Sequence, residues 1–212
     1  FDVAHDRGLR TACFAGKSKF GIFDRSWSGT TGAPDTVGAD DGRDKIDLYL
    51  YSADSAVLTD VLRDAMAATP FAYAFIHFPD PDAAGHAYGW ESKPYFDAVM
   101  RVDGFIGEIL DLLETDPRCA GHARLVVAVD HGGEDTDHST PTNPRNYTIP
   151  LYVWGAGVSA GADLYALNPA SRLDPDGGRP GYGDAPQPIR NGEAGNLCLA
   201  FLGLPAIPGS TI

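Results

Sequence analysis

The chain has 212 residues, of which 43% are hydrophobic and 21% are charged, and these proportions are ordinary for a globular protein with a sizeable buried core. The formal net charge of −13 at pH 7 disfavours nucleic acid as a partner, because phosphate backbones are bound by clustered Lys and Arg side chains. The sequence contains no run of about 18 apolar residues, so no segment is predicted to span a membrane.

Five short segments carry the apolar pattern of β-strands. Residues 71–78 and 124–129 are almost continuously apolar, which is typical of strands that are buried on both faces of a parallel sheet. The other predicted strands are 10–16, 46–51 and 149–154.

Between these strands, apolar residues recur with helical spacing. The pattern predicts helices over 54–68 and 92–115, and a short final helix over 194–203. Ser92 is well placed to be the N-cap of the longest helix, because its hydroxyl can accept a bond from an unpaired backbone N–H of the first turn.

The alternation of strands and helices predicts a single α/β domain over residues 1–212, with a largely parallel central sheet flanked by helices. Residues 26–44 are predicted to form a loop, and residues 161–190, rich in Pro, Gly and Asp, an irregular surface excursion. In such folds, ligands bind beyond the carboxyl ends of the strands. The segments that follow 71–78 and 124–129 are therefore where a site is expected.

The beginning of the chain also carries information. Phe1 is preceded by no Met and no signal peptide, and residues 1–9 look like the end of a helix that leads into a strand. This pattern predicts that an N-terminal part of the domain lies upstream of Phe1. A missing strand would leave sheet edges exposed, so homo-oligomers that form through those edges are expected.

Two polar motifs lie at the predicted strand ends. Asp80-Pro-Asp-Ala-Ala-Gly-His86 follows the 71–78 strand, and Asp130-His-Gly-Gly-Glu-Asp-Thr-Asp-His138 follows the 124–129 strand. Three of the six histidines of the chain lie in these two motifs, with carboxylates beside them. Imidazole nitrogen and carboxylate oxygen are ligands that Zn²⁺ takes at about 2.0–2.2 Å, so the combination predicts a metal site.

Five residues of these motifs are the predicted metal ligands: Asp82, His86, Asp130, His131 and His138. Asp82 and His86 are four residues apart, a spacing at which side chains can converge at a turn or at a first helical turn. Asp80 is a rival to Asp82, but its spacing to His86 is less suitable. The three histidines favour Zn²⁺, with Mn²⁺ or Fe as alternatives.

The two motifs resemble those of the alkaline phosphatase superfamily, and in particular its nucleotide pyrophosphatase/phosphodiesterase branch. There, an Asp-x-x-Gly-His loop follows one strand and an Asp-His-Gly loop follows another. The resemblance extends to the run from Gly8 to Lys17, to residues 147–155 and to residues 191–205. It therefore covers nearly the whole chain, and it implies an alkaline phosphatase-like α/β fold.

The resemblance also implies roles for single residues. Asp82, His86 and His138 match the ligands of one metal ion, and Asp130 and His131 match ligands of a second. The family places its nucleophilic Thr or Ser, with another Asp, after an earlier strand. Both are expected upstream of Phe1, so this chain alone is expected to show negligible turnover. By resemblance only, a secreted or periplasmic location is favoured.

Three further residues are candidates for contact with a substrate. Lys17 follows a predicted strand and could reach an anionic group, although a solvated surface lysine is the alternative interpretation. Tyr88 and Trp90 flank the exit of the first motif and could line a substrate pocket, or they could be ordinary packing aromatics.

The leading functional hypothesis is a metal-dependent hydrolase of phosphoric mono- or diesters that uses two divalent metal ions and acts on a small phosphorylated substrate. A net acidic surface permits such a substrate, because metal ions can reverse the local field. A sulfatase of the same superfamily is one alternative, and a non-catalytic metal-binding domain that lacks the nucleophile is another. A phosphomutase is disfavoured, because its large inserted domain has no room between residues 23 and 71.

Overall fold

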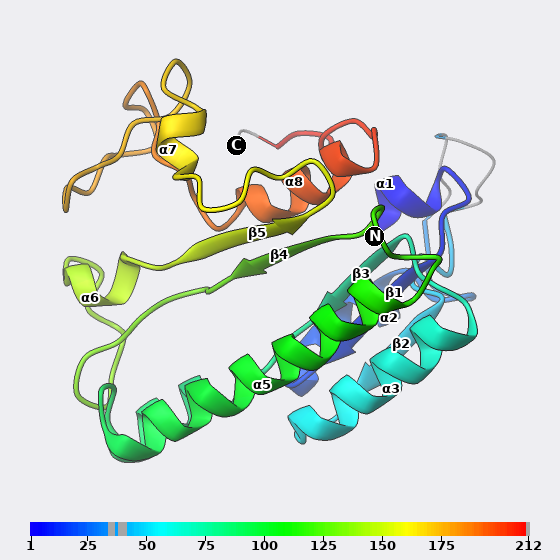
Figure 1. Cartoon of the computed structure of the whole chain (residues 1–212), viewed down its shortest axis with the longest axis horizontal. Coiled ribbons are helices and arrows are strands. Elements are labelled where there is room, and N and C mark those ends of the chain that lie inside the picture. Colours follow the sequence, from blue (N-terminus) through cyan, green and yellow to red (C-terminus); the bar gives the residue numbers. More distant parts are fainter. Residues whose placement is uncertain (34–36, 38–41, 211–212) are drawn as a thin grey trace.

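The computed structural model describes residues 1–33, 37 and 42–210 (Figure 1). The predicted loop 26–44 therefore lies partly outside the described residues, at positions 34–36 and 38–41. Every predicted strand is present, although most are shorter than their apolar runs. The strands are β1 (Thr11–Ala15), β2 (Leu48–Tyr51), β3 (Tyr73–Ile76), β4 (Arg124–Ala128) and β5 (Leu151–Gly155).

Three helices match the predicted ranges 54–68, 92–115 and 194–203, another lies within residues 1–9, where the end of a helix was expected, and several short helices were not predicted. Ser92 caps the longest helix, since its Oγ accepts a bond from the Tyr95 N–H at 3.3 Å, and this confirms the predicted N-cap. In the described part of the chain, none of the helices is long and apolar enough to cross a membrane. The helices are α1 (Asp2–His5), η1 (Ser18–Phe20), α2 (Gly21–Ser26), α3 (Ser55–Ala68), α4 (Asp80–Tyr88), α5 (Lys93–Thr115), α6 (Pro144–Tyr147), α7 (Leu164–Leu167) and α8 (Glu193–Phe201).

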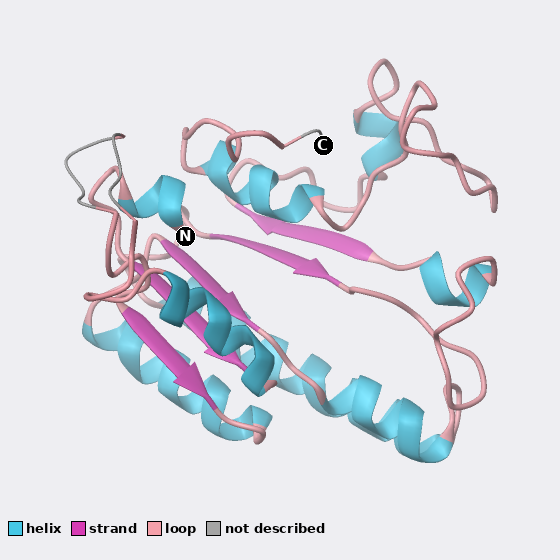
Figure 2. Ribbon diagram, turned by 180° about the vertical axis from the view of Figure 1, so that it is seen from behind, coloured by secondary structure: helices cyan, strands magenta, loops and turns pink. Residues whose placement is uncertain are grey.

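A three-stranded parallel sheet with the order β2-β1-β3 forms the centre of the domain. Helices flank this sheet, as Figure 2 shows, so the structure is the predicted α/β class. The central strand β1 is fully buried, and its side chains alternate between two apolar clusters. Ala12 and Phe14 face the cluster built with α3 and α5, while Cys13 and Ala15 face a cluster that includes Phe20.

The two remaining strands depart from the predicted arrangement. β4 pairs antiparallel with β5 in a separate two-stranded sheet, in which Val126 lies opposite Val153. The prediction that 71–78 and 124–129 are strands buried on both faces was wrong. β3 is mostly half-buried, and both ends of β4 are exposed. Among the described strands, β3 pairs only with β1 and β4 only with β5, so each has an unpaired edge.

Residues 161–190 contain the four-residue helix α7 and otherwise turns and irregular backbone. The three cysteines, Cys13, Cys119 and Cys198, are all free thiols. Helix α4 follows β3 after a short connection, and the loop 129–143 follows β4, so the two polar motifs lie in the segments that come after these two strands.

Candidate metal centre

Helix α4 positions the first two site residues. It begins at Asp80, shortly after β3 ends at Ile76, and has Pro81 in its first turn, where a backbone N–H would have no partner within the helix. Asp82 lies in the first turn, where a carboxylate is favoured by the helix dipole. His86 follows one turn later, and its Nε2 lies 3.4 Å from Asp82 Oδ1. The predicted convergence of these two residues on a helical turn is thus present in the structure.

The loop after β4 brings two more histidines to the same place. A short turn is closed by reciprocal backbone bonds of 3.0 Å between Glu134 and Asp137, with Asp135 at a φ of +51°. This turn folds the chain back so that the rings of His131 and His138 stack, with centroids 3.7 Å apart and planes 19° apart. Figure 1 shows the loop reaching toward the segment that leads into α5.

Asp82 Oδ1 faces these imidazoles. It lies 3.4 Å from His86 Nε2, 3.7 Å from His131 Nε2 and 3.9 Å from His138 Nε2. The Nε2 atoms of His86 and His138 are 3.2 Å apart. Two ligand atoms of a tetrahedral Zn²⁺ site are separated by about 3.3 Å. Asp82, His86 and His138 are a group that could hold a metal ion and are called the metal triad below: each offers a ligand atom within 4.8 Å of the others.

The hydrogen bonds of the metal triad fit a cation. Asp82 Oδ1 is buried and has no hydrogen-bond partner among the described residues. His86 Nδ1 lies 3.0 Å from the carbonyl oxygen of Thr136, which can only accept, so Nδ1 carries a proton, and Nε2 presents a lone pair whenever the ring is neutral. A buried, unpaired carboxylate oxygen beside such a nitrogen is unfavourable by itself. A divalent cation would satisfy both atoms, and the Thr136 carbonyl orients the histidine as a metal ligand requires.

Lys17 holds the other oxygen of the same carboxylate. Its Nζ lies 2.6 Å from Asp82 Oδ2, and the two side chains are 32% and 20% exposed. Burial, the largest single influence, raises the pKa of Asp82, but the hydrogen bond and charge of Lys17, with the charges of His86 and His131, outweigh it. The pKa of Asp82 therefore lies below its ordinary value of 3.8, and the carboxylate is ionised. The predicted substrate residue Lys17 thus contacts a predicted metal ligand.

The second predicted pair lies beside the metal triad and outside it. Asp130 is 70% exposed, and its Oδ2 is 3.5 Å from His131 Nε2. The loop here is anchored from the other end of the chain, because the Asn191 side chain donates to the carbonyl oxygens of Val129 and Asp130. His131 faces both Asp82 and Asp130, so its ring lies near a predicted ligand of each of the two metal ions.

Two other polar residues of the first motif face elsewhere. Asp80 accepts a hydrogen bond from Ser55 Oγ and lies 3.8 Å from Arg101 Nη1. Asp80, the alternative to Asp82 as a metal ligand, therefore links α3, α4 and α5. Tyr88 is 66% exposed and lines a hollow with Asp80 and Arg101 that no member of the metal triad lines. The structure therefore does not bring this predicted substrate residue to the triad.

Trp90 lies against the histidines. Its ring centroid is 5.1 Å from that of His86, 5.8 Å from that of His138 and 6.4 Å from that of His131. Sequence reasoning placed it near the site but missed the carbonyl oxygen of Thr136, because every residue has a backbone carbonyl and no side-chain type signals one that orients a ligand.

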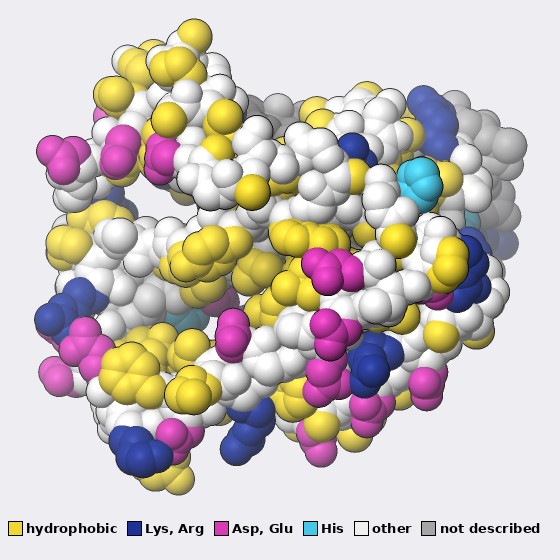
Figure 3. All heavy atoms as spheres, viewed as in Figure 1, with side chains coloured by type: hydrophobic (Ala, Val, Ile, Leu, Met, Phe, Trp, Pro, Cys, Tyr) yellow, Lys and Arg dark blue, Asp and Glu magenta, His cyan; other side chains and the backbone are white. Residues whose placement is uncertain are grey.

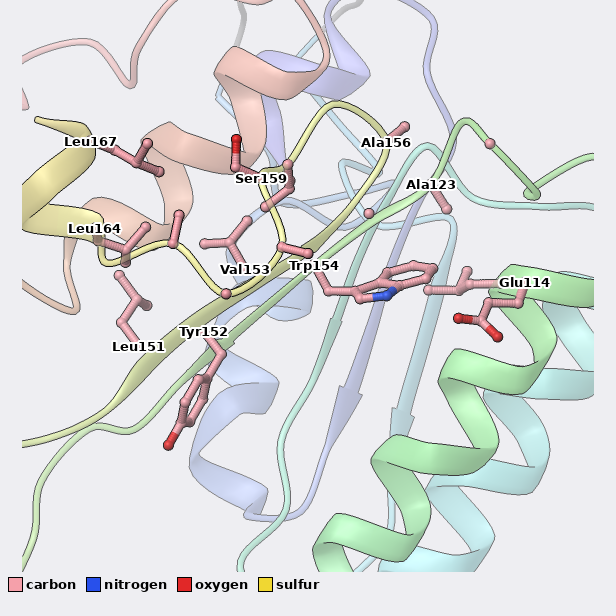
Figure 4. A pocket seen from close by; sticks show the side chains of 17 residues that line it. Glu114, Ala123, Leu151, Tyr152, Val153, Trp154, Ala156, Ser159, Leu164 and Leu167 are labelled. Atoms are coloured by element: carbon pink, nitrogen blue, oxygen red, sulfur yellow. The ribbon is translucent and has the colours of Figure 1, made fainter.

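A larger hollow, of about 670 Å³, lies away from the metal triad. Hydrophobic side chains gather between α5 and the β4–β5 sheet in the space-filling view (Figure 3). The hollow follows β5 between the end of α5 and the segment that includes α7, with Tyr152, Trp154 and Leu164 among its lining (Figure 4). No residue of the metal triad lines it, so its size does not mark the place where metal chemistry could occur.

Comparison with known proteins identifies the family. The family model described as Type I phosphodiesterase / nucleotide pyrophosphatase matches residues 1–173. The chain belongs to this family. The match covers both polar motifs and all three strands of the parallel sheet, and it confirms the resemblance inferred from the motifs.

Curated relatives of this phosphodiesterase-family chain match shorter stretches. It is 32% identical over 85 residues to GPI ethanolamine phosphate transferase 1 of Yarrowia lipolytica, covering 40% of the chain and 9% of the relative. It is 29% identical over 100 residues to the same-named protein of Schizosaccharomyces pombe, and this match covers 44% of the chain and 11% of the relative. It is 34% identical over 91 residues to the 2,3-bisphosphoglycerate-independent phosphoglycerate mutase of Pyrococcus horikoshii, and this match covers 41% of the chain and 18% of the relative. The chain thus spans a small part of each of these relatives.

Proposed function

We propose that the chain is the metal-binding part of a metal-dependent hydrolase of phosphoric mono- or diesters that uses two divalent metal ions. The family to which it belongs processes phosphoesters, which supports this substrate class. The single observation that carries the proposal is Asp82 Oδ1, a buried and unpaired carboxylate oxygen that faces the Nε2 atoms of three histidines.

Asp82, His86 and His138 would hold one ion, and Asp130 and His131 would contribute to the second. Bound together, two such ions stabilise the attacking and leaving oxygens of a displacement at phosphorus. The donor set of imidazole nitrogens and carboxylates favours Zn²⁺, with Mn²⁺ or Fe as alternatives.

The residues of the chain prepare this centre. Lys17 helps to lower the pKa of Asp82 and holds Oδ2, which leaves Oδ1 toward the imidazoles. The Thr136 carbonyl oxygen keeps the His86 proton on Nδ1, so that Nε2 stays available as a ligand atom. His131 Nδ1 faces the Gly132 carbonyl at 2.9 Å and is oriented in the same way.

A second candidate function is phosphoryl transfer to an acceptor other than water, and the names of the relatives favour it, because they denote a transferase and a mutase. The sulfatase alternative involves the same kind of centre but a different anion. A non-catalytic metal-binding domain would keep the metal triad but would not bind a phosphate or sulfate ester at the metal.

Anion binding separates the phosphoester candidates from the sulfatase and from the non-catalytic domain. Calorimetric titration of the chain with phenyl phosphate and with phenyl sulfate, with and without Zn²⁺, measures the preference. We expect phenyl phosphate to bind at least tenfold more tightly in the presence of Zn²⁺, and phenyl sulfate to bind more weakly than phenyl phosphate. A preference for the sulfate ester would favour the sulfatase. Equal affinity for phenyl phosphate with and without Zn²⁺ would contradict the proposal.

A further inference from the structure

We propose that Trp90 is a positioning residue that assembles the metal triad, by fixing helix α4 against the loop after β4. The inference rests on the proposed metal centre. It concerns a side chain that offers no ligand atom of its own, yet lies against the imidazoles of His86, His131 and His138.

The indole contacts the histidines in favourable geometry. Its plane stands at 84° to the ring of His86 and at 74° to the ring of His138, which are edge-to-face arrangements. Aromatic pairs prefer such arrangements, because the electropositive edge of one ring then meets the electronegative face of the other. One indole therefore constrains the two histidines of the metal triad, although one is on a helix and the other on a loop 52 residues later.

Glycines make the room that the indole occupies. A Cβ atom added at Gly85, on α4, would lie 2.7 Å from indole atoms, and one added at Gly133, on the loop, would lie 2.3 Å from them. Real Cβ contacts are essentially never shorter than 3.0 Å. The indole is thus held between the backbones of the two elements that carry the metal triad, at positions where a side chain would push it out.

The backbone fixes the same junction. The Trp90 N–H donates to the Asp135 carbonyl oxygen at 2.6 Å. The preceding residue, Gly89, has a φ of +93°, a conformation that turns the chain sharply at the end of α4 and directs Trp90 toward the loop. Removing the indole would leave this backbone bond and the contact of His86 with the Thr136 carbonyl, but it would take away the ring against which both imidazoles pack. Residues that orient metal ligands contribute about 10–100-fold to metal affinity.

Four variants test the inference. Trp90→Ala removes the indole, Trp90→Phe keeps an aromatic ring, and Gly133→Ala keeps the indole but fills its space. Gly104→Ala is the matched control, because a Cβ at Gly104 on α5 would meet no atom within 4 Å. Zn²⁺ affinity is measured by competition with a chromophoric chelator, and the melting temperature of the metal-free protein reports on folding. The absorption spectrum of the Co²⁺-loaded protein reports on ligand geometry.

The expected results are specific. Trp90→Ala and Gly133→Ala should weaken Zn²⁺ binding about 10–100-fold and shift the Co²⁺ bands. Trp90→Phe should recover most of the affinity, and Gly104→Ala should match the wild type. Wild-type Zn²⁺ affinity in Trp90→Ala and Gly133→Ala would overturn the inference while leaving the metal centre intact. A wild-type protein that binds no Zn²⁺ would overturn both proposals. If Trp90→Ala does not fold, Gly133→Ala and Trp90→Phe decide the outcome.

Discussion

Replacing Asp82 by Asn should separate metal binding from stability. The side chain keeps its size and loses its charge. Asp82 Oδ1 faces the Nε2 atoms of three histidines at 3.4–3.9 Å and is the carboxylate of the metal triad. Loss of a residue that merely orients a ligand weakens metal binding about 10–100-fold. Loss of this ligand should therefore weaken Zn²⁺ binding at least about 100-fold, or about 2.7 kcal/mol.

The metal-free protein should tolerate the same change. The ion pair with Lys17 is lost, but both side chains are partly exposed, and an ion pair of this kind contributes about 0–1 kcal/mol. The buried Oδ1 has no hydrogen bond to lose within the described structure. The unfolding free energy of the metal-free variant should thus lie within about 1 kcal/mol of the wild type.

Asp80→Asn is the matched control, since Asp80 lies on the same helix turn but pairs with Ser55 and Arg101. Zn²⁺ affinity by chelator competition and unfolding in urea are measured on the wild type and on both variants. Zn²⁺ affinity of Asp82→Asn within about threefold of the wild type would refute the assignment. An equal loss of affinity in Asp80→Asn would also refute it, because the rival carboxylate would then bind the metal.

Two further predictions concern titration. Lys17→Met should raise the pKa of Asp82, because burial then acts with less opposition; the NMR titration of its carboxyl resonance measures this, and an unchanged pKa would contradict the proposed role of Lys17. Burial raises the pKa of the Cys13 thiol from 9.0 to about 12, so its contribution to stability is complete below pH 9 and is lost as the pH rises toward 12. Urea unfolding between pH 9 and 11 should show a stability that falls less steeply in Cys13→Ala than in the wild type, and equal slopes would argue against this cause.

The residues of the candidate metal centre could be singled out from the sequence because their signal is local. Each motif follows an apolar run, and the Asp82–His86 spacing places both side chains on one face whenever those residues form a helix. The structure brings all three histidines to Asp82 and leaves Asp130 largely exposed. That His131 faces Asp82 while Asp130 is exposed could not be predicted from the sequence, because the two residues are neighbours in the same motif.

The contact of Lys17 with Asp82 could not be predicted, because it depends on strand register. The two residues are 65 positions apart. They meet because β1 and β3 are parallel, with Phe14 opposite Ile76, so that both strands end at the same edge of the sheet. The apolar runs predicted the strands but not their pairing, which is also why the antiparallel β4–β5 pair and the half-buried side chains of β3 and β4 were missed.

The place of Trp90 was hidden for a similar reason. Its proximity to the first motif was visible in the sequence, but the space that it fills depends on Gly85 and Gly133, which lie on different elements. A glycine in a polar motif can serve a turn, a close approach or a helix, and only the packed structure shows that these two accommodate an indole.

The most direct test of the metal centre is a crystal structure of the Zn²⁺-loaded protein with anomalous diffraction recorded at the zinc edge. An anomalous peak should lie within about 2.0–2.2 Å of Asp82 Oδ1, His86 Nε2 and His138 Nε2. A fully loaded crystal with no zinc peak at this position, whether or not zinc binds elsewhere on the chain, would contradict the account.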